Sequence, residues 1–152
     1  MSTSYEADVV AWANEQAEFL RAGRFDLLDR EHLAEQIEDV GKCEQRELAN
    51  RMAVLLAHLL KWQYQPGRRR SSWESTVALQ RKEISCVLNE APSLASRLRD
   101  PLWIDRFWSN AVAEVITETG LNCFPEACPW SIEGEVLKGG WFPEAQKHAS
   151  DR

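Results

Sequence analysis

The feature that most constrains the fold is a long run of helical periodicity from Glu31 to Tyr64. Apolar residues recur there three and four positions apart, no proline interrupts them, and Gly41 is the only glycine. As one helix the run would extend about 50 Å, although a domain of this length has a radius of gyration of about 15 Å. We predict a long helix that is continuous or mildly bent near Gly41. Its apolar stripes are formed by Leu33, Ile37 and Val40, and by Leu48, Met52, Leu55, Leu56, Leu59, Leu60 and Trp62.

Local stop and start signals divide the rest of the chain into further helices. Ala22-Gly23 ends a first helix, and Gln65-Pro66-Gly67 ends the long one, because proline cannot extend it. Ser71 or Ser72 is predicted to cap a third helix. Asp100-Pro101 starts a fourth, which ends at Gly120. The predicted helices cover residues 8–21, 31–64, 71–88 and 101–119, with one or two helical turns over 94–99.

The final segment, residues 121–152, differs in composition from the rest. Prolines and glycines alternate there with large aromatic residues. We predict a tail laid over the helices, with one short helix over 131–138 and frayed residues over 146–152. Since no run alternates apolar and polar residues, the predicted fold is an all-α antiparallel bundle of about four main helices. We expect a single domain over 1–152, ordered over about 5–143.

Composition is that of an ordinary soluble globular protein, and it limits the partners. The 152 residues are 44% hydrophobic and 28% charged, with a net charge of −6, so nucleic acid or an anionic membrane needs a local basic patch. No secretory signal or membrane-spanning run is present, and no membrane contact is expected. Scattered cysteines without a signal predict reduced thiols in the cytoplasm. They are Cys43, Cys86, Cys123 and Cys128, and their spacing does not favour a zinc site.

A basic hairpin over residues 58–81 is the best candidate for a partner contact. With the adjoining Lys82 and Glu83 included, six Lys and Arg residues stand against Glu74 and Glu83, a local charge of +4. Arginine binds phosphate or carboxylate, and tryptophans can stack on bases, so nucleic acid or an acidic protein is the predicted partner. The alternative is a solvated loop paired with the chain's own acids, with the tryptophans packed inward. The candidate residues are His58, Lys61, Trp62, Gln65, Arg68, Arg69, Arg70, Trp73 and Arg81.

The histidines give weaker signals. Helical phase places His58 beside the Leu55 and Leu59 stripe, where a packed, hydrogen-bonded side chain is favoured over a ligand. Neither His32 nor His148 has a partner that is evident in the sequence.

Paired acids offer an alternative chemistry. Glu35 and Glu38 lie three residues apart on one helix face, where carboxylates can hold a hard divalent cation or act as a general base. The same spacing arises on any solvated helix face. His58 lies about 30 Å further along a straight helix, so it could join these acids only from a second subunit. No phosphate loop, nucleophile elbow or catalytic triad is present, and no cofactor is predicted.

The order of several short motifs is similar to a bacterial family called "domain of unknown function twenty-nine". The matching motifs are Leu28-Asp29, Leu33-Ala34-Glu35-Gln36-Ile37-Glu38, Leu56-Ala57-His58-Leu59-Leu60-Lys61-Trp62, Tyr64-Gln65-Pro66, Ser72-Trp73, Gln80-Arg81, Pro92-Ser93-Leu94, Phe124-Pro125 and Cys128-Pro129-Trp130. The resemblance covers about residues 12–143 and implies an all-helical fold without an established activity. One departure is Gln36, which stands where the family pattern has the second of two adjacent acids.

Two functional hypotheses follow. The leading one is a binding module that contacts protein or nucleic acid through the basic hairpin, with a homodimer along the long helix as an option. The alternative is a metal-dependent hydrolase that uses Glu35 and Glu38.

Overall fold

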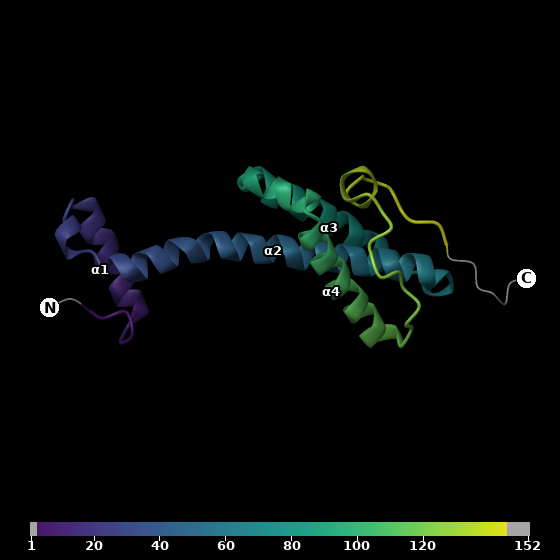
Figure 1. The fold of residues 1–152 in the computed structure, drawn as a ribbon, viewed down its shortest axis with the longest axis horizontal. Coiled ribbons are helices and arrows are strands. Elements are labelled where there is room, and N and C mark those ends of the chain that lie inside the picture. Colours follow the sequence, from purple (N-terminus) through teal and green to yellow (C-terminus); the bar gives the residue numbers. More distant parts are fainter. Residues whose placement is uncertain (1–2, 146–152) are drawn as a thin grey trace, which may run out of the picture. The chain divides into compact units, whose positions relative to one another are not determined.

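Helices account for nearly all regular structure in the computed structural model, which describes residues 3–145 (Figure 1). No strand forms over these residues, which confirms the all-α prediction. The frayed segment predicted over 146–152 lies outside the described residues. The elements are α1 (Val9–Arg21), η1 (Phe25–Leu27), α2 (Arg30–Tyr64), η2 (Pro66–Arg68), α3 (Ser71–Glu90), η3 (Pro92–Arg99), α4 (Pro101–Thr119) and η4 (Ile132–Val136).

The chain divides into two compact units, Met1–Cys43 and Glu44–Arg152, called here the N-terminal and C-terminal units. Helix α2 contributes to both, and it continues through Gly41 as one helix, as predicted. Because the two units share this helix, the single domain expected from the sequence stays a prediction.

The N-terminal unit is built around a small set of polar and aromatic contacts. Asp8 caps α1 by accepting from the Ala11 amide at 3.0 Å, and Asp29 accepts from the His32 amide at 3.4 Å at the start of α2. Among residues 3–43 only Trp12 and Gln16 are buried. The apolar stripe predicted to pack there is uncovered, since Ile37 is 71% exposed and Val40 68%. Periodicity identifies an apolar face, and here no neighbouring element covers it.

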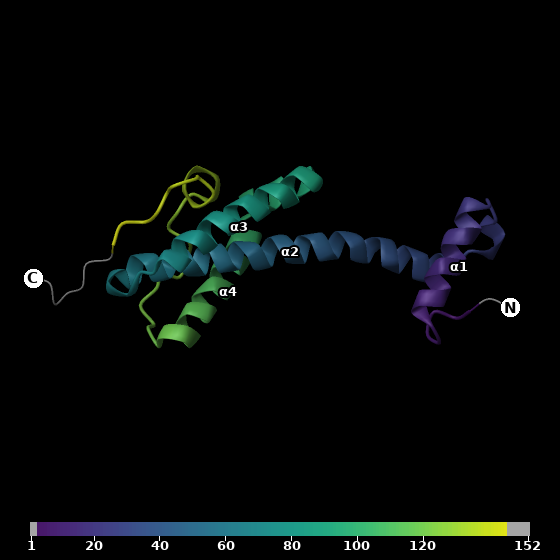
Figure 2. The same ribbon diagram turned by 180° about the vertical axis from the view of Figure 1, so that it is seen from behind.

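The C-terminal unit holds the hydrophobic core. Helix α3 folds back alongside the second half of α2, and α4 crosses α2 obliquely (Figures 1 and 2). Leu56, Leu59 and Phe107 are fully buried between these helices. Three long helices each contribute an apolar face, so the second stripe predicted on α2 is covered along its length.

The ends of α3 and α4 show which local signals held. Asp100 caps α4 by accepting from the Leu102 amide at 3.0 Å, and Gly120 ends it with a left-handed φ of 74°. The predicted serine cap of α3 is wrong. Arg70 occupies the cap position without a side-chain hydrogen bond. Its backbone is extended, and α3 already begins at Ser71.

The aromatic tail lies over the bundle, as predicted. Its short helix is a single π turn, η4, rather than a helix over 131–138. Trp130 packs edge-to-face on Trp108 and Trp141, with ring centroids 5.5 and 5.7 Å away. The Trp108 indole donates to the Pro125 carbonyl at 2.8 Å. These tryptophans therefore fix the tail to the bundle.

Candidate anion-binding cleft

Lys61 is the most unusual residue of the basic hairpin, because it is a buried lysine. Its residue surface is only 7% exposed. The Nζ atom lies 3.0 Å from Glu118 Oε2 on α4 and 5.4 Å from the ring centroid of Trp73 on α3. A buried ammonium group requires such partners to offset the loss of hydration. Lys61 therefore fixes a positive charge where α2, α3 and α4 meet.

The turn after α2 adds further basic groups beside Lys61. Tyr64 ends the helix, and Pro66 begins η2, whose geometry leaves the consecutive Arg68, Arg69 and Arg70 exposed. A hollow of about 340 Å³ opens beside this turn. We call it the basic cleft. It is lined by Lys61, Gln65, Arg68, Arg70, Trp73, Glu118 and Thr119.

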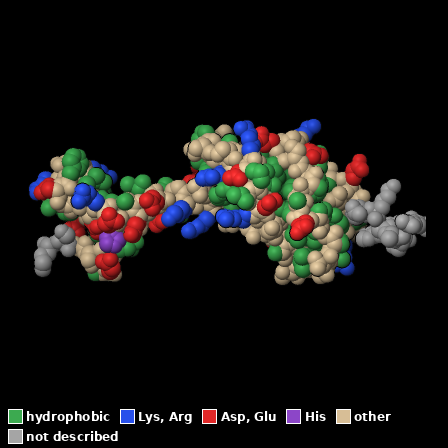
Figure 3. Space-filling view, viewed as in Figure 1, with side chains coloured by type: hydrophobic (Ala, Val, Ile, Leu, Met, Phe, Trp, Pro, Cys, Tyr) green, Lys and Arg blue, Asp and Glu red, His purple; other side chains and the backbone are tan. Residues whose placement is uncertain are grey.

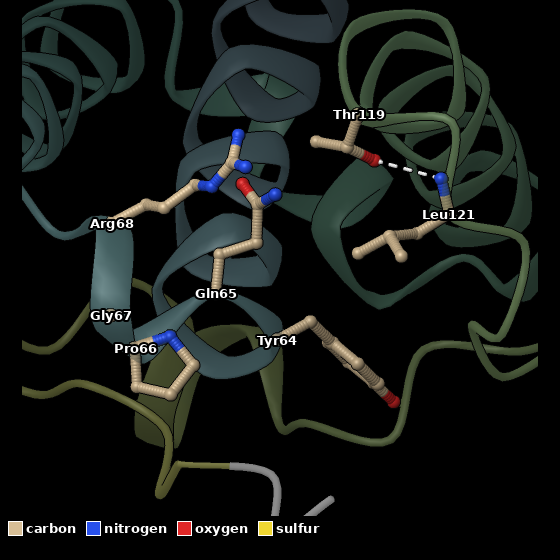
Figure 4. A pocket seen from close by; sticks show the side chains of 7 residues that line it. All are labelled: Tyr64, Gln65, Pro66, Gly67, Arg68, Thr119 and Leu121. Atoms are coloured by element: carbon tan, nitrogen blue, oxygen red, sulfur yellow. Dashed lines mark hydrogen bonds between the residues drawn. The ribbon is translucent and has the colours of Figure 1, made fainter.

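A second hollow of about 450 Å³ adjoins the basic cleft and shares Gln65, Arg68 and Thr119 with it. Figure 4 shows the Gln65 and Arg68 side chains next to each other at their shared wall. Its remaining wall is mostly apolar, formed by Tyr64, Pro66, Gly67 and Leu121. A charged compartment thus lies beside a less polar one.

The electrostatics of the basic cleft favour an anion. Three cationic side chains line it, against the single carboxylate of Glu118, which already binds Lys61. Within residues 3–145, the side chains of Arg68 and Arg70 take part in no hydrogen bond or ion pair, although their backbones bond within the turn. Their guanidinium groups are therefore available to a carboxylate or phosphate.

Trp62 and Arg69 contact each other, and neither side chain lines the basic cleft. The Arg69 guanidinium lies 4.3 Å from the Trp62 ring centroid, and its Nε donates to the Trp62 carbonyl at 3.0 Å. Phe142 of the tail packs on the same indole at 4.3 Å. The half-buried Trp62 ring therefore already packs against two side chains of the same chain.

Arg81 serves the tail. Its Nε donates to the Val136 carbonyl at 2.9 Å, and its Nη2 donates to the Trp141 carbonyl at 2.6 Å. Burial lowers the pKa of this guanidinium. Arg81 does not line the basic cleft, so its contacts indicate a structural role in holding the tail.

His58 is packed in the way helical phase suggested. Its Nδ1 donates to the Val54 carbonyl at 2.9 Å, one turn back along α2. Burial lowers its pKa, and the opposing effects of that carbonyl and of nearby Glu114 and Glu118 do not reverse the shift. A neutral His58 therefore stands one turn before Lys61, outside the residues that line the cleft.

His32 has partners that the sequence reading missed. Its Nδ1 lies 2.7 Å from Asp29 Oδ2, its Nε2 lies 3.1 Å from Glu6 Oε1, and its ring stacks on Tyr5 at 4.3 Å. The hydrogen bond to Asp29 raises the pKa of His32, with Glu6 adding to the effect. Trp12 also donates to Asp29, at 3.0 Å. Asp29 thus joins α1 to the start of α2.

The acids of the alternative hypothesis stand on the surface. Glu35 and Glu38 are both exposed, and over the described part of the chain no three His, Cys, Asp or Glu residues gather as a metal site. Gln36, which departs from the family pattern, donates to the Tyr5 hydroxyl at 2.9 Å. Its amide therefore holds the N-terminal segment against α2.

Comparison with known protein families identifies one family that matches most of the chain. A sequence model of the family "Domain of unknown function DUF29" matches residues 4–142. The chain belongs to the DUF29 family. The match includes residues of both units and all the residues that line the basic cleft. No curated protein and no solved structure matches the chain.

Some residues of the site had no signal in the sequence. Glu118 and Thr119 end α4, Leu121 follows its Gly120 cap, and 57 positions separate Lys61 from Glu118. Only the packing of α4 against α2 brings them together.

Within residues 3–145 no helix is long and apolar enough to cross a lipid bilayer.

Proposed function

We propose that the protein is a binding module whose basic cleft receives the carboxylates of an acidic protein segment. The observation that carries the proposal is the convergence of free Arg68 and Arg70 on a hollow with a buried Lys61 at its wall. Arginine forks bind carboxylates in bidentate geometry, and the buried lysine supplies a charge that solvent screens little.

The surroundings support a protein segment over nucleic acid. Of the two hairpin tryptophans, Trp62 packs against Arg69 and Phe142, and Trp73 lies 5.4 Å from Lys61 Nζ in the wall of the basic cleft, so both rings already have partners within the chain. The chain as a whole carries a net charge of −6, which repels a long polyanion. The adjoining hollow, with Tyr64 and Leu121 in its wall, suits an apolar side chain next to the acidic one.

The test is a binding titration with two labelled probes, a Glu- and Asp-rich peptide and a single-stranded oligonucleotide. In an Arg68→Ala/Arg70→Ala variant we expect peptide affinity to fall by about tenfold or more, the order of loss for hydrogen bonds between charged groups. Arg46→Ala/Lys82→Ala is the matched control, because both residues are exposed, carry the same charge and do not line the cleft.

Three results would contradict this assignment. An equal loss in the control variant would mean that net charge, not the cleft, drives binding. Tighter binding of the oligonucleotide, lost in the arginine variant, would assign the cleft to nucleic acid. Absence of peptide binding at low salt would remove the acidic-segment proposal altogether.

We also propose the cytoplasm as the compartment, supported by the free state of all four cysteines, of which Cys43, Cys86 and Cys123 are exposed. Burial raises the pKa of the fourth, Cys128. Reaction with a thiol reagent without prior reduction should modify the three exposed cysteines first.

Self-association through α2 is supported by the exposed Ile37 and Val40, although the charge of the N-terminal unit opposes it. For the alternative, a metal-dependent hydrolase, the spacing of Glu35 and Glu38 on α2 is the remaining supporting observation. Stoichiometric binding of Mn²⁺ that is lost in Glu35→Ala would revive it.

A further inference from the structure

The N-terminal unit exposes an unusual share of the large hydrophobic side chains. Among the described residues, seven of the nine that are exposed belong to this unit, although it is the smaller of the two. They are Val9, Val10, Leu20, Phe25, Leu27, Ile37 and Val40. Single exposed apolar residues are normal on proteins, but their concentration on one small unit indicates an interaction surface.

The exposed residues follow helical faces. On α1, Val9, Ala13 and Leu20 recur at intervals of four and seven, with the half-buried Ala17 between them, so they form one stripe along the helix. On α2, Ile37 and Val40 lie three positions apart on one face. The alanines in the middle of the α1 stripe leave room for a helix to approach closely. Each helix thus presents an uncovered face suited to a second helix.

The unit also buries too little to be complete. Over residues 3–43 its interior consists of Trp12 and Gln16. Units of this size usually require disulfides, a metal or association with another chain. Its one cysteine, Cys43, is free, and none of the described residues form a metal-ligand group. Association with another chain remains as the stabilising contact.

The charge of the N-terminal unit distinguishes between a second copy of this chain and a different partner protein. Residues 1–43 contain ten acidic and four basic residues, a net charge of −6, whereas residues 44–152 contain fourteen of each. The whole net charge of the protein therefore belongs to the N-terminal unit. Figure 3 shows acidic and hydrophobic side chains next to each other on the visible face of this unit. Two copies brought together by this unit would repel each other, and a basic partner would be attracted.

We infer that the N-terminal unit is a docking surface for a basic amphipathic helix of a partner protein, which covers the apolar faces of α1 and α2 while its Lys and Arg residues meet the surrounding acids. This surface is distinct from the basic cleft in residues and in sign of charge. The chain would therefore connect two partners of opposite charge, one at each unit.

The test uses the full-length chain and a synthetic helical peptide of leucine and lysine, about 14 residues long so that it spans about four turns. We expect saturable binding, and an affinity loss of about tenfold or more in an Ile37→Gln/Val40→Gln variant, the order of effect for truncating apolar anchors. Glutamine is a good helix former at exposed sites, and circular dichroism checks that α2 is retained.

The matched control is Leu79→Gln/Leu102→Gln, which replaces the two large hydrophobic residues that are exposed in the described part of the C-terminal unit. This variant should bind the peptide as the wild type does. A counterpart peptide with glutamate in place of lysine should not bind the N-terminal unit, and Arg68→Ala/Arg70→Ala should leave binding of the basic peptide unchanged. Failure of the basic cleft and failure of this surface are therefore separate outcomes.

Several outcomes would overturn the inference. One is equal affinity of the basic peptide for the wild type and the Ile37→Gln/Val40→Gln variant. Another is a dimer of the free chain in sedimentation that dissociates in this variant, which would assign the surface to a second copy. A third is binding to phosphatidylcholine and phosphatidylserine vesicles that depends on the same residues.

Discussion

The two units contrast in how they use apolar residues of the same helix. In the C-terminal unit, α2 buries Leu48, Leu56 and Leu59 completely under α3 and α4. In the N-terminal unit, the same helix leaves Ile37 and Val40 open. One unit has a finished core and no net charge, and the other has a minimal core and all of the net charge. Along one helix, an apolar stripe therefore forms part of a closed core in one unit and an exposed surface in the other.

The largest predicted difference between the units concerns truncation of apolar residues. Leu56→Ala should cost about 2–5 kcal/mol of unfolding free energy, because it leaves a cavity in a closed core. Ile37→Ala should change it by about 0.5 kcal/mol or less, because solvent already surrounds that side chain. Urea unfolding measures both. Similar losses in the two variants would mean that Ile37 is covered in solution.

The second prediction concerns the tail of the C-terminal unit. Arg81→Met should release it, because the Val136 and Trp141 carbonyls lose their donor. We expect a loss of about 1–3 kcal/mol, together with faster proteolysis after residue 121 and unchanged exchange of α1 amides. If the tail of this variant stays protected from protease, the aromatic packing alone holds it.

The third prediction separates stability from binding at the cleft. Glu118→Gln leaves buried Lys61 without its ion-pair partner and should cost about 1 kcal/mol, a reduced figure because Glu118 is about half-exposed. The same change makes the cleft more positive, so affinity for the acidic peptide should rise. Thermal unfolding and peptide titration measure the two effects. Weaker peptide binding would show that Glu118 positions Lys61 for the ligand.

Sequence reasoning succeeded for most local signals, with the serine cap of α3 as the exception, and it failed where packing against neighbouring elements decides. The Asp100-Pro101 start and the Gly120 end of α4 depend on residues next to each other in the chain. The exposure of Ile37 depends on whether another element covers it, which periodicity does not report. His32 had one signal that could have been read, Asp29 three residues before it, whereas Glu6 reaches His32 only through the fold of the N-terminal segment.

The smallest predicted effect is an opposite pH response of the two central histidines. Asp29, Glu6 and Glu35 raise the pKa of His32 above its ordinary value of about 6.5, so its stabilising effect is present below that pH and is lost as the pH rises through the folded pKa. Burial lowers the pKa of His58, so its contribution is present above about pH 6.5 and is lost as the pH falls. An NMR titration of the two imidazoles measures both. Equal pKa values would contradict the distinct environments.

Native-state hydrogen exchange of the full chain tests most directly the claim that the N-terminal unit is incomplete. Exchange should occur in α1, and in α2 up to residue 43, through local opening at a free energy well below that of global unfolding. The buried segments of α2, α3 and α4 should exchange only through global unfolding. Adding the basic leucine–lysine peptide should raise protection in the N-terminal unit alone. Equal protection of both units in the free chain, unchanged by the peptide, would contradict the account.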